Sequence, residues 1–118
     1  MQVEETLQLA LPPQELWPWL AEPARRARWI PEESRVASRV ERADPPRELV
    51  LRASGLPQDL EVRLTLTLIS EGAGTRLSLR AEAELTGMMI FAEKLIASKA
   101  QGKLAEWGRN LRALVAAS

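Results

Sequence analysis

The sequence predicts a two-layer α+β fold, in which a curved antiparallel sheet of about five strands wraps around a long C-terminal helix. Residues 34–85 mostly alternate apolar and polar side chains, which is the period of half-buried strands. Short connections rich in glycine, proline and aspartate interrupt this alternation and favour an antiparallel meander. Residues 88–116 contain no proline and repeat apolar side chains at helical spacing. A chain of 118 residues is the size of one domain, so we expect a single domain over residues 1–118.

The first strand is predicted over residues 2–11, where Val3, Leu7, Leu9 and Leu11 share one face, and Pro12-Pro13 ends it. A short helix follows over 14–20, opened by Pro13, with a kink expected at Pro18. A second short helix is expected over 24–29. The chain therefore opens as one strand and two short helices.

Four further strands form the predicted meander: 34–42, 47–54, 60–69 and 75–85. Their connections are expected at 44–46, 55–59 and 71–74. The strand at 60–69 shows the pattern best, because its leucines and valine alternate with charged residues and threonines. Each strand has one apolar and one charged face, so we expect the sheet to be covered on one side only.

The covering element is predicted to be the helix over 88–116, which is roughly 40 Å long at 1.5 Å per residue. Its apolar stripe comprises Met89, Ala92, Ile96, Ala100, Leu104, Trp107, Leu111 and Leu114. Gly102 and Gly108 each cost about 1 kcal/mol of helix propensity. They indicate either close approach to the sheet or an exposed position.

Composition excludes several classes of function. The 16 Lys and Arg residues balance 16 Asp and Glu residues, which argues against nucleic-acid binding and against a polybasic membrane anchor. The chain has no His, Cys or Tyr, which removes the commonest general base, the thiol nucleophile and metal sites built on imidazole or thiolate. We therefore expect no metal, no cofactor and a role that is not catalytic.

Location and source are indicated by the same composition. The chain begins without the basic and apolar stretches of a signal peptide and has no apolar run of about 20 residues. We therefore expect a cytoplasmic protein without stable membrane insertion. The excess of arginine over lysine, together with abundant leucine and alanine, is typical of a GC-rich bacterial genome.

Few polar residues fall in the inward register of the predicted strands. Glu5 does so, and a buried carboxylate needs either a partner or a raised pKa, which makes it a candidate functional group. The alternative is a frayed strand end that leaves Glu5 in water. Ser38 also falls near the inward register and is a second candidate polar contact. The cluster Arg25-Arg26-Arg28 is flanked by glutamates and predicts a solvated surface.

Three stretches of the sequence resemble the START-like (SRPBCC) helix-grip superfamily. The run from Leu7 to Pro23 is similar to its strand-proline-helix opening, and Trp29-Ile30-Pro31 resembles its exit from the second helix. Gly74-Thr75-Arg76-Leu77, followed by Gly87, is similar to members related to polyketide cyclases and to an accessory subunit of carbon monoxide dehydrogenase. The resemblance implies a cavity between sheet and helix for lipids, hormones, quinones or polyketides. The five strands here, two fewer than is usual, imply a smaller cavity.

The leading hypothesis is a small binding protein that holds an apolar or amphipathic molecule. Its site is expected to include Trp29, Leu64, Leu66, Leu79, Met88, Phe91 and Leu95, with polar contacts from Glu5 and Ser38. One alternative is an enzyme of the cyclase or dehydratase type with Glu5 as acid or base. The other is an interaction module that binds itself or another protein, a role implied by the resemblance to the carbon monoxide dehydrogenase accessory protein.

Overall fold

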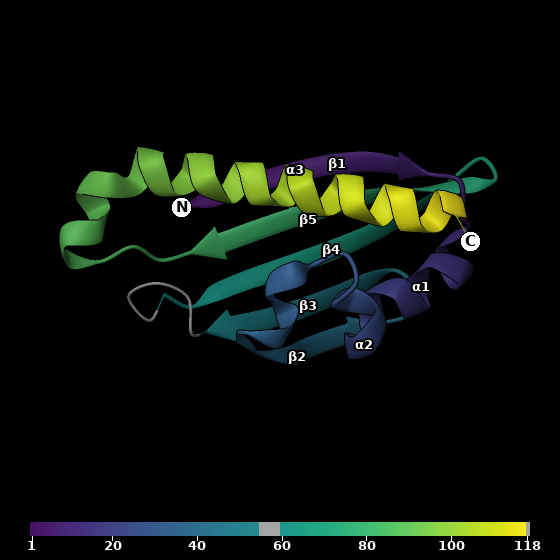
Figure 1. Ribbon diagram of the computed structural model, residues 1–118, viewed down its shortest axis with the longest axis horizontal. Helices are drawn as coiled ribbons and strands as arrows, with labels where there is room; N and C mark the ends of the chain where they lie inside the picture. Colours follow the sequence, from purple (N-terminus) through teal and green to yellow (C-terminus); the bar gives the residue numbers. More distant parts are fainter. Residues whose placement is uncertain (55–59, 118) are drawn as a thin grey trace.

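The computed structural model describes residues 1–54 and 60–117, which form a single antiparallel sheet with helices against it (Figure 1). The strand order is β1-β5-β4-β3-β2, and every neighbouring pair is antiparallel. The strands are β1 Gln2–Leu9, β2 Ala37–Asp44, β3 Glu48–Ser54, β4 Val62–Glu71 and β5 Gly74–Ala83. The predicted five-stranded α+β architecture is confirmed.

The helices are α1 Pro13–Ala21, α2 Pro23–Arg26, η1 Pro31–Ser34, η3 Gly87–Ala92 and α3 Glu93–Ala117, where η1 and η3 are 3₁₀ helices. Figure 1 shows α3 running lengthwise beside β1 and β5 and joined at one end to η3, while α1 lies at the other end of the sheet. Leucines of α1 and α3 share one core with the inward leucines of the sheet, so both helices cover the same face. Among the described residues, no helix is long and apolar enough to cross a membrane.

Several predicted boundaries were wrong. The strand predicted from Ser34 begins at Ala37, because Pro31 opens the 3₁₀ turn η1 just before it. The long helix is 3₁₀ rather than α over residues 87–92, where no residue is buried. Helices in proteins gain most of their stability from packing, so an unpacked first turn need not be α-helical. The predicted connection at 55–59 lies outside the described residues.

Inward side chains of the sheet form rows across the strands, and the rows differ in size from one end to the other. At the α1 end the rows consist of leucines, such as Leu77 opposite Leu7 and Leu68. The rows nearest η3 contain smaller residues, with Ala83 opposite Val62 and Val62 opposite Ala53. The sheet therefore offers a thick apolar layer at one end and a thin one at the other.

Helix α3 follows the same division. Its buried apolar side chains are Leu104, Leu111 and Val115. None of residues 93–103, all of which lie in the described part of the chain, is buried. The C-terminal half of α3 thus completes the core, whereas its N-terminal half stands away from the sheet.

The opposite face of the sheet carries ion pairs. Arg63 lies directly opposite Glu82. Glu41 accepts hydrogen bonds from Arg52 at 2.9 Å and from Arg63 at 3.0 Å. The hydrogen bond from Arg52 is the main reason why the pKa of Glu41 lies below its usual range. The paired charges on this face contrast with the apolar inner face of the sheet.

Candidate functional site

A cavity of about 660 Å³ lies between the inner face of the sheet and α3. Small-molecule sites typically measure about 300–1,000 Å³. Strands β3, β4 and β5 form its floor, α3 its roof, η1 one side and η3 one end. Its lining residues are Met1, Ile30, Glu32, Glu33, Val36, Ser38, Leu51, Ala53, Leu60, Val62, Leu64, Ala81, Met88, Met89, Ala92, Leu95, Ile96, Lys99, Ala100, Lys103, Leu104 and Trp107.

Four alanines line the cavity, two from the sheet and two from the helical layer. Ala53 and Ala81 stand in the inward register of β3 and β5, at positions equivalent to those that leucines occupy nearer α1. Ala92 of η3 and Ala100 of α3 also line the cavity. Because a methyl group cannot reach across the gap between sheet and helix, the two layers remain apart here.

The apolar stripe predicted for the long helix therefore has two roles. Its first members, from Met89 to Ala100, line the cavity. Leu111 is fully buried in the core. The helical spacing correctly identified the face that turns towards the sheet, although it did not distinguish cavity wall from packed core.

The structure brings together four of the sequence-predicted site residues. Leu64, Met88, Leu95 and Ser38 all line the cavity. Leu66 and Leu79 are fully buried one row closer to α1, so they belong to the packed core and not to the cavity wall.

Trp29 is also fully buried in the core and does not line the cavity. Its indole Nε1 donates a hydrogen bond to the Trp19 carbonyl at 2.8 Å, and its own carbonyl accepts one from Asn110 Nδ2 at 3.2 Å. Trp29 therefore connects α1 with α3.

Glu5 has the predicted inward register, opposite Leu79. Its side chain is half-buried, and Oε2 accepts a hydrogen bond from Gln101 Nε2 at 2.9 Å. The same amide donates to the Glu4 carbonyl at 2.8 Å. Glu5 thus lies between the edge strand and α3, and it is not among the residues that line the cavity.

Sequence reasoning missed a polar cluster in the cavity wall. Arg26, predicted to be solvated, is only 3% exposed, so that prediction was wrong. Its Nη1 donates to the Leu20 carbonyl at 2.7 Å, near the end of α1, where carbonyls lack helical partners. Its Nε and Nη2 donate to Glu33 Oε1 at 2.9 and 2.7 Å, and Ser38 Oγ donates to the same oxygen at 2.9 Å. Of this cluster, the sequence pattern had indicated only Ser38.

A second polar cluster links η1 to α3 across the cavity. Glu32 accepts hydrogen bonds from Trp107 Nε1 at 3.1 Å and from Lys103 Nζ at 3.4 Å. Lys103 also donates to Glu106 at 3.3 Å. The hydrogen bond to Glu106, reinforced by the charge of Glu32, raises the pKa of Lys103. Lys103 therefore remains a cation, and both oxygens of Glu32 are occupied.

Exposed apolar residues surround the η3 end of the cavity. Met88 and Leu95 line the cavity while remaining 81% and 62% exposed. Phe91, at 86% exposure, and Ile90, at 56%, lie beside them without lining it. The same side chains thus touch both the interior and the solvent, which places the mouth of the cavity at η3.

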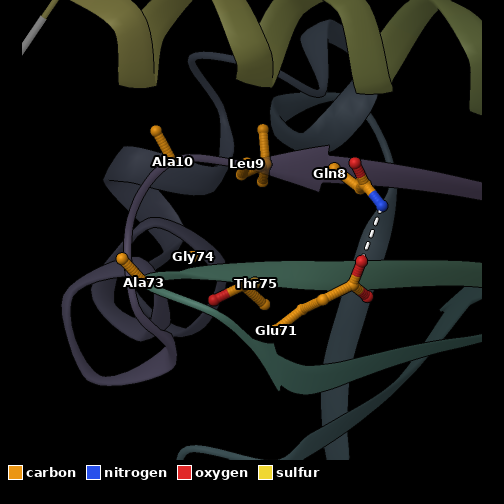
Figure 2. A pocket seen from close by; sticks show the side chains of 7 residues that line it. All are labelled: Gln8, Leu9, Ala10, Glu71, Ala73, Gly74 and Thr75. Carbon is orange, nitrogen blue, oxygen red and sulfur yellow. Dashed lines mark hydrogen bonds between the residues drawn. The ribbon is translucent and has the colours of Figure 1, made fainter.

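A smaller hollow of about 260 Å³ lies at the far end of β1, near the β4–β5 turn (Figure 2). Its polar side chains already have partners, because Gln8 Nε2 donates to Glu71 Oε1 at 2.7 Å and Thr75 Oγ1 donates to the Leu11 carbonyl at 2.7 Å. The larger cavity is therefore the candidate site.

Structural relatives share this fold at low sequence identity. The MLL2253 protein of Mesorhizobium loti matches with a TM-score of 0.83 and 17% identity, covering 100% of this chain and 98% of that one. A protein from Rhodobacter sphaeroides matches with a TM-score of 0.74 and 24% identity, and the match covers 98% of this chain and 92% of that one. CalU16 from Micromonospora echinospora matches with a TM-score of 0.72 and 17% identity, and the match covers 97% of this chain and 73% of that one. The Mesorhizobium match covers nearly all of both chains, so the short form of the fold is not peculiar to this protein.

The sequence itself matches no curated protein. It does match a protein family, described as polyketide cyclase / dehydrase and lipid transport, over residues 1–117. This match spans the sheet, the short helices and α3, and therefore includes every element that forms the cavity. The chain belongs to the polyketide cyclase / dehydrase and lipid transport family.

Proposed function

We propose that this protein holds an apolar or amphipathic small molecule, such as a lipid, a quinone or a polyketide-like compound, without transforming it. The observation that carries the proposal is the cavity of about 660 Å³ between sheet and α3, whose wall is mainly aliphatic and whose mouth lies at η3. Burying apolar ligand surface contributes roughly 25 cal/mol per Å² before the costs of binding. The family description, which includes lipid transport, agrees with this role.

Two features favour binding over catalysis. The sequence offers no His, Cys or Tyr for acid-base or nucleophilic chemistry. Glu5, the carboxylate considered for a cyclase or dehydratase, accepts a hydrogen bond from Gln101 and does not line the cavity. An acid or base must come within hydrogen-bonding reach of the proton that it transfers. The catalytic alternative therefore has less support than simple binding.

Filling the cavity should abolish binding. In Ala100→Phe, the added ring occupies space between α3 and the sheet, so we expect the dissociation constant for Nile red to rise at least about tenfold. Fluorescence titration measures this constant. Ala113→Phe is the matched control, because residue 113 is exposed on the same helix and does not line the cavity.

Equal weakening in both variants would point to a general effect on the helix. Wild-type protein that binds neither the dye nor any co-purified molecule detectable by native mass spectrometry would contradict the proposal. A non-covalent adduct lost on denaturation would give the mass of the natural ligand directly.

The second candidate function is self-association through the apolar mouth, which Phe91 and Met88 favour by their exposure of 86% and 81%. If two copies bury this surface against each other, Phe91→Ser should shift the sedimentation coefficient towards that of the monomer. Ile69→Ser is the control, because Ile69 is an exposed apolar residue on β4, away from the mouth. A wild-type protein that remains monomeric at all concentrations tested by sedimentation velocity would exclude this candidate.

A further inference from the structure

Glu33 is an unusual residue for the wall of an apolar cavity. Its side chain is only 10% exposed, and it lines the cavity beside Ser38. All its hydrogen bonds converge on one oxygen, Oε1, which accepts from Arg26 Nε at 2.9 Å, Arg26 Nη2 at 2.7 Å and Ser38 Oγ at 2.9 Å. The carboxylate is thus held from two sides, by α2 and by β2.

The other oxygen, Oε2, accepts no hydrogen bond from any described residue. Among residues 1–54 and 60–117, the only fully buried side-chain polar atom without a hydrogen-bond partner is Arg80 Nε. Since Oε2 has no hydrogen-bond partner and is not that atom, it must be partly exposed. Glu33 is nine-tenths buried and lines the cavity, which makes a molecule held in the cavity the candidate donor for Oε2. A carboxylate oxygen has lone pairs for about two hydrogen bonds, and these remain available.

The surrounding charges decide which donor fits this oxygen. The charged groups around the cavity are nearly balanced. Its wall includes Glu32, Glu33, Lys99, Lys103 and Met1. Arg26 pairs with Glu33, Glu106 pairs with Lys103, and Glu93 pairs with the ammonium group of Met1. A cationic ligand would compete with Arg26, which already pairs with the Glu33 carboxylate. An anionic ligand would place its charge against Oε2. A neutral O–H donor avoids both penalties and gains a charge-assisted hydrogen bond.

We infer that Glu33 is a ligand-recognition residue, whose Oε2 accepts a hydrogen bond from the hydroxyl group of an uncharged, otherwise apolar ligand such as a phenol or a long-chain alcohol. This inference rests on the proposed binding function and narrows its ligand class. Ser38 and Arg26 act as positioning residues, because they fix the carboxylate. Arg26 is itself fixed by the Leu20 carbonyl at 2.7 Å. Such support from neighbouring groups is what a directional binding contact requires.

The test compares 1-naphthol with 1-methoxynaphthalene, which has nearly the same apolar body but no donor. Displacement of Nile red from the wild-type protein gives both dissociation constants. We expect 1-naphthol to bind about tenfold more tightly, as one charge-assisted hydrogen bond allows. Since both probes are measured on one protein, this comparison does not depend on the folding of any variant.

Two variants test whether the preference for 1-naphthol depends on Glu33. In the double variant Arg26→Met/Glu33→Leu, which removes both charges together, the ratio of the two dissociation constants should fall to about one. Glu32→Gln is the matched control, because Glu32 lines the same cavity but has both oxygens engaged, and it should retain the ratio.

The outcomes separate the inference from the function on which it rests. Equal binding of the two probes to the wild-type protein would overturn the inference and leave the proposed function intact. A preference for 1-naphthol that persists in the double variant would overturn the assignment to Glu33. Failure of both probes to displace the dye would contradict the proposed function, and the inference with it.

Discussion

Replacing Arg26 alone with methionine should lower the free energy of unfolding by about 3–5 kcal/mol, the usual cost of removing one partner of a buried ion pair. The guanidinium is 3% exposed and satisfies both Glu33 and the Leu20 carbonyl. Without it, the Glu33 carboxylate, which is 10% exposed, keeps only the hydroxyl of Ser38 as a donor from the protein. Urea denaturation followed by circular dichroism measures the loss.

The double variant Arg26→Met/Glu33→Leu serves as the comparison for this prediction. Replacing a buried pair with apolar residues of similar size is often neutral or stabilising, so its stability should return close to that of the wild type. If Arg26→Met alone unfolds at the same urea concentration as the wild type, the pair is solvated in solution and our description of the cavity wall is wrong.

Substituting Gly74 with alanine should destabilise the protein by about 3 kcal/mol, at the upper end of the usual cost of overpacking. A Cβ atom at this position would overlap the Leu9 carbonyl oxygen. This contact is with backbone, which cannot rotate away as a side chain does. Figure 2 shows Gly74 at the start of β5, next to the end of β1. Thermal unfolding of Gly74→Ala would report the loss as a lower midpoint temperature.

The same substitution at Gly102 provides the control. A Cβ there would meet nothing within 4 Å, and the residue lies inside α3. Alanine favours helix over glycine by about 1 kcal/mol, so Gly102→Ala should raise the stability by up to that amount. If Gly74→Ala is as stable as Gly102→Ala, the backbone where β1 meets β5 can shift to make room for the Cβ atom, and our expectation is wrong.

The fold could be predicted from the sequence because its determinants are local. Alternation identifies the inward face of each strand, and it correctly placed Glu5 in the inward register of the first strand. Proline pairs and short polar connections correctly limited the strands to an antiparallel meander. Helical periodicity then identified the face of α3 that turns towards the sheet.

The site was harder to predict from the sequence, because its geometry depends on how residues pair across strands. Ala53 and Ala81 come from different strands. Only the observed registers show that these alanines, together with Ala100 of α3, line the same cavity. Leu79 was predicted at the site because alternation shows which face of the strand a side chain lies on. It does not show whether that side chain lies in the packed core or in the cavity wall. A small residue at an inward position where neighbouring strands carry leucine would have been a better signal.

Arg26 illustrates a second limit. A run of arginines flanked by glutamates is typical of a solvated surface. Its actual partner depends on where α1 ends and on the turn that brings Glu33 back towards it. No spacing rule for helices or strands links residues 26 and 33. Tertiary packing determined this contact.

The division of α3 into a packed C-terminal half and an unpacked N-terminal half has a consequence for how the protein can evolve. Leu111 belongs to the hydrophobic core and does not line the cavity, whereas Ala53 and Ala100 line the cavity and lie outside that core. Changes in the size of the cavity alanines alter its shape without removing packed core, so their cost in stability is small. Substitutions at these alanines can therefore change the size of the cavity while Leu111 and the core around it stay the same.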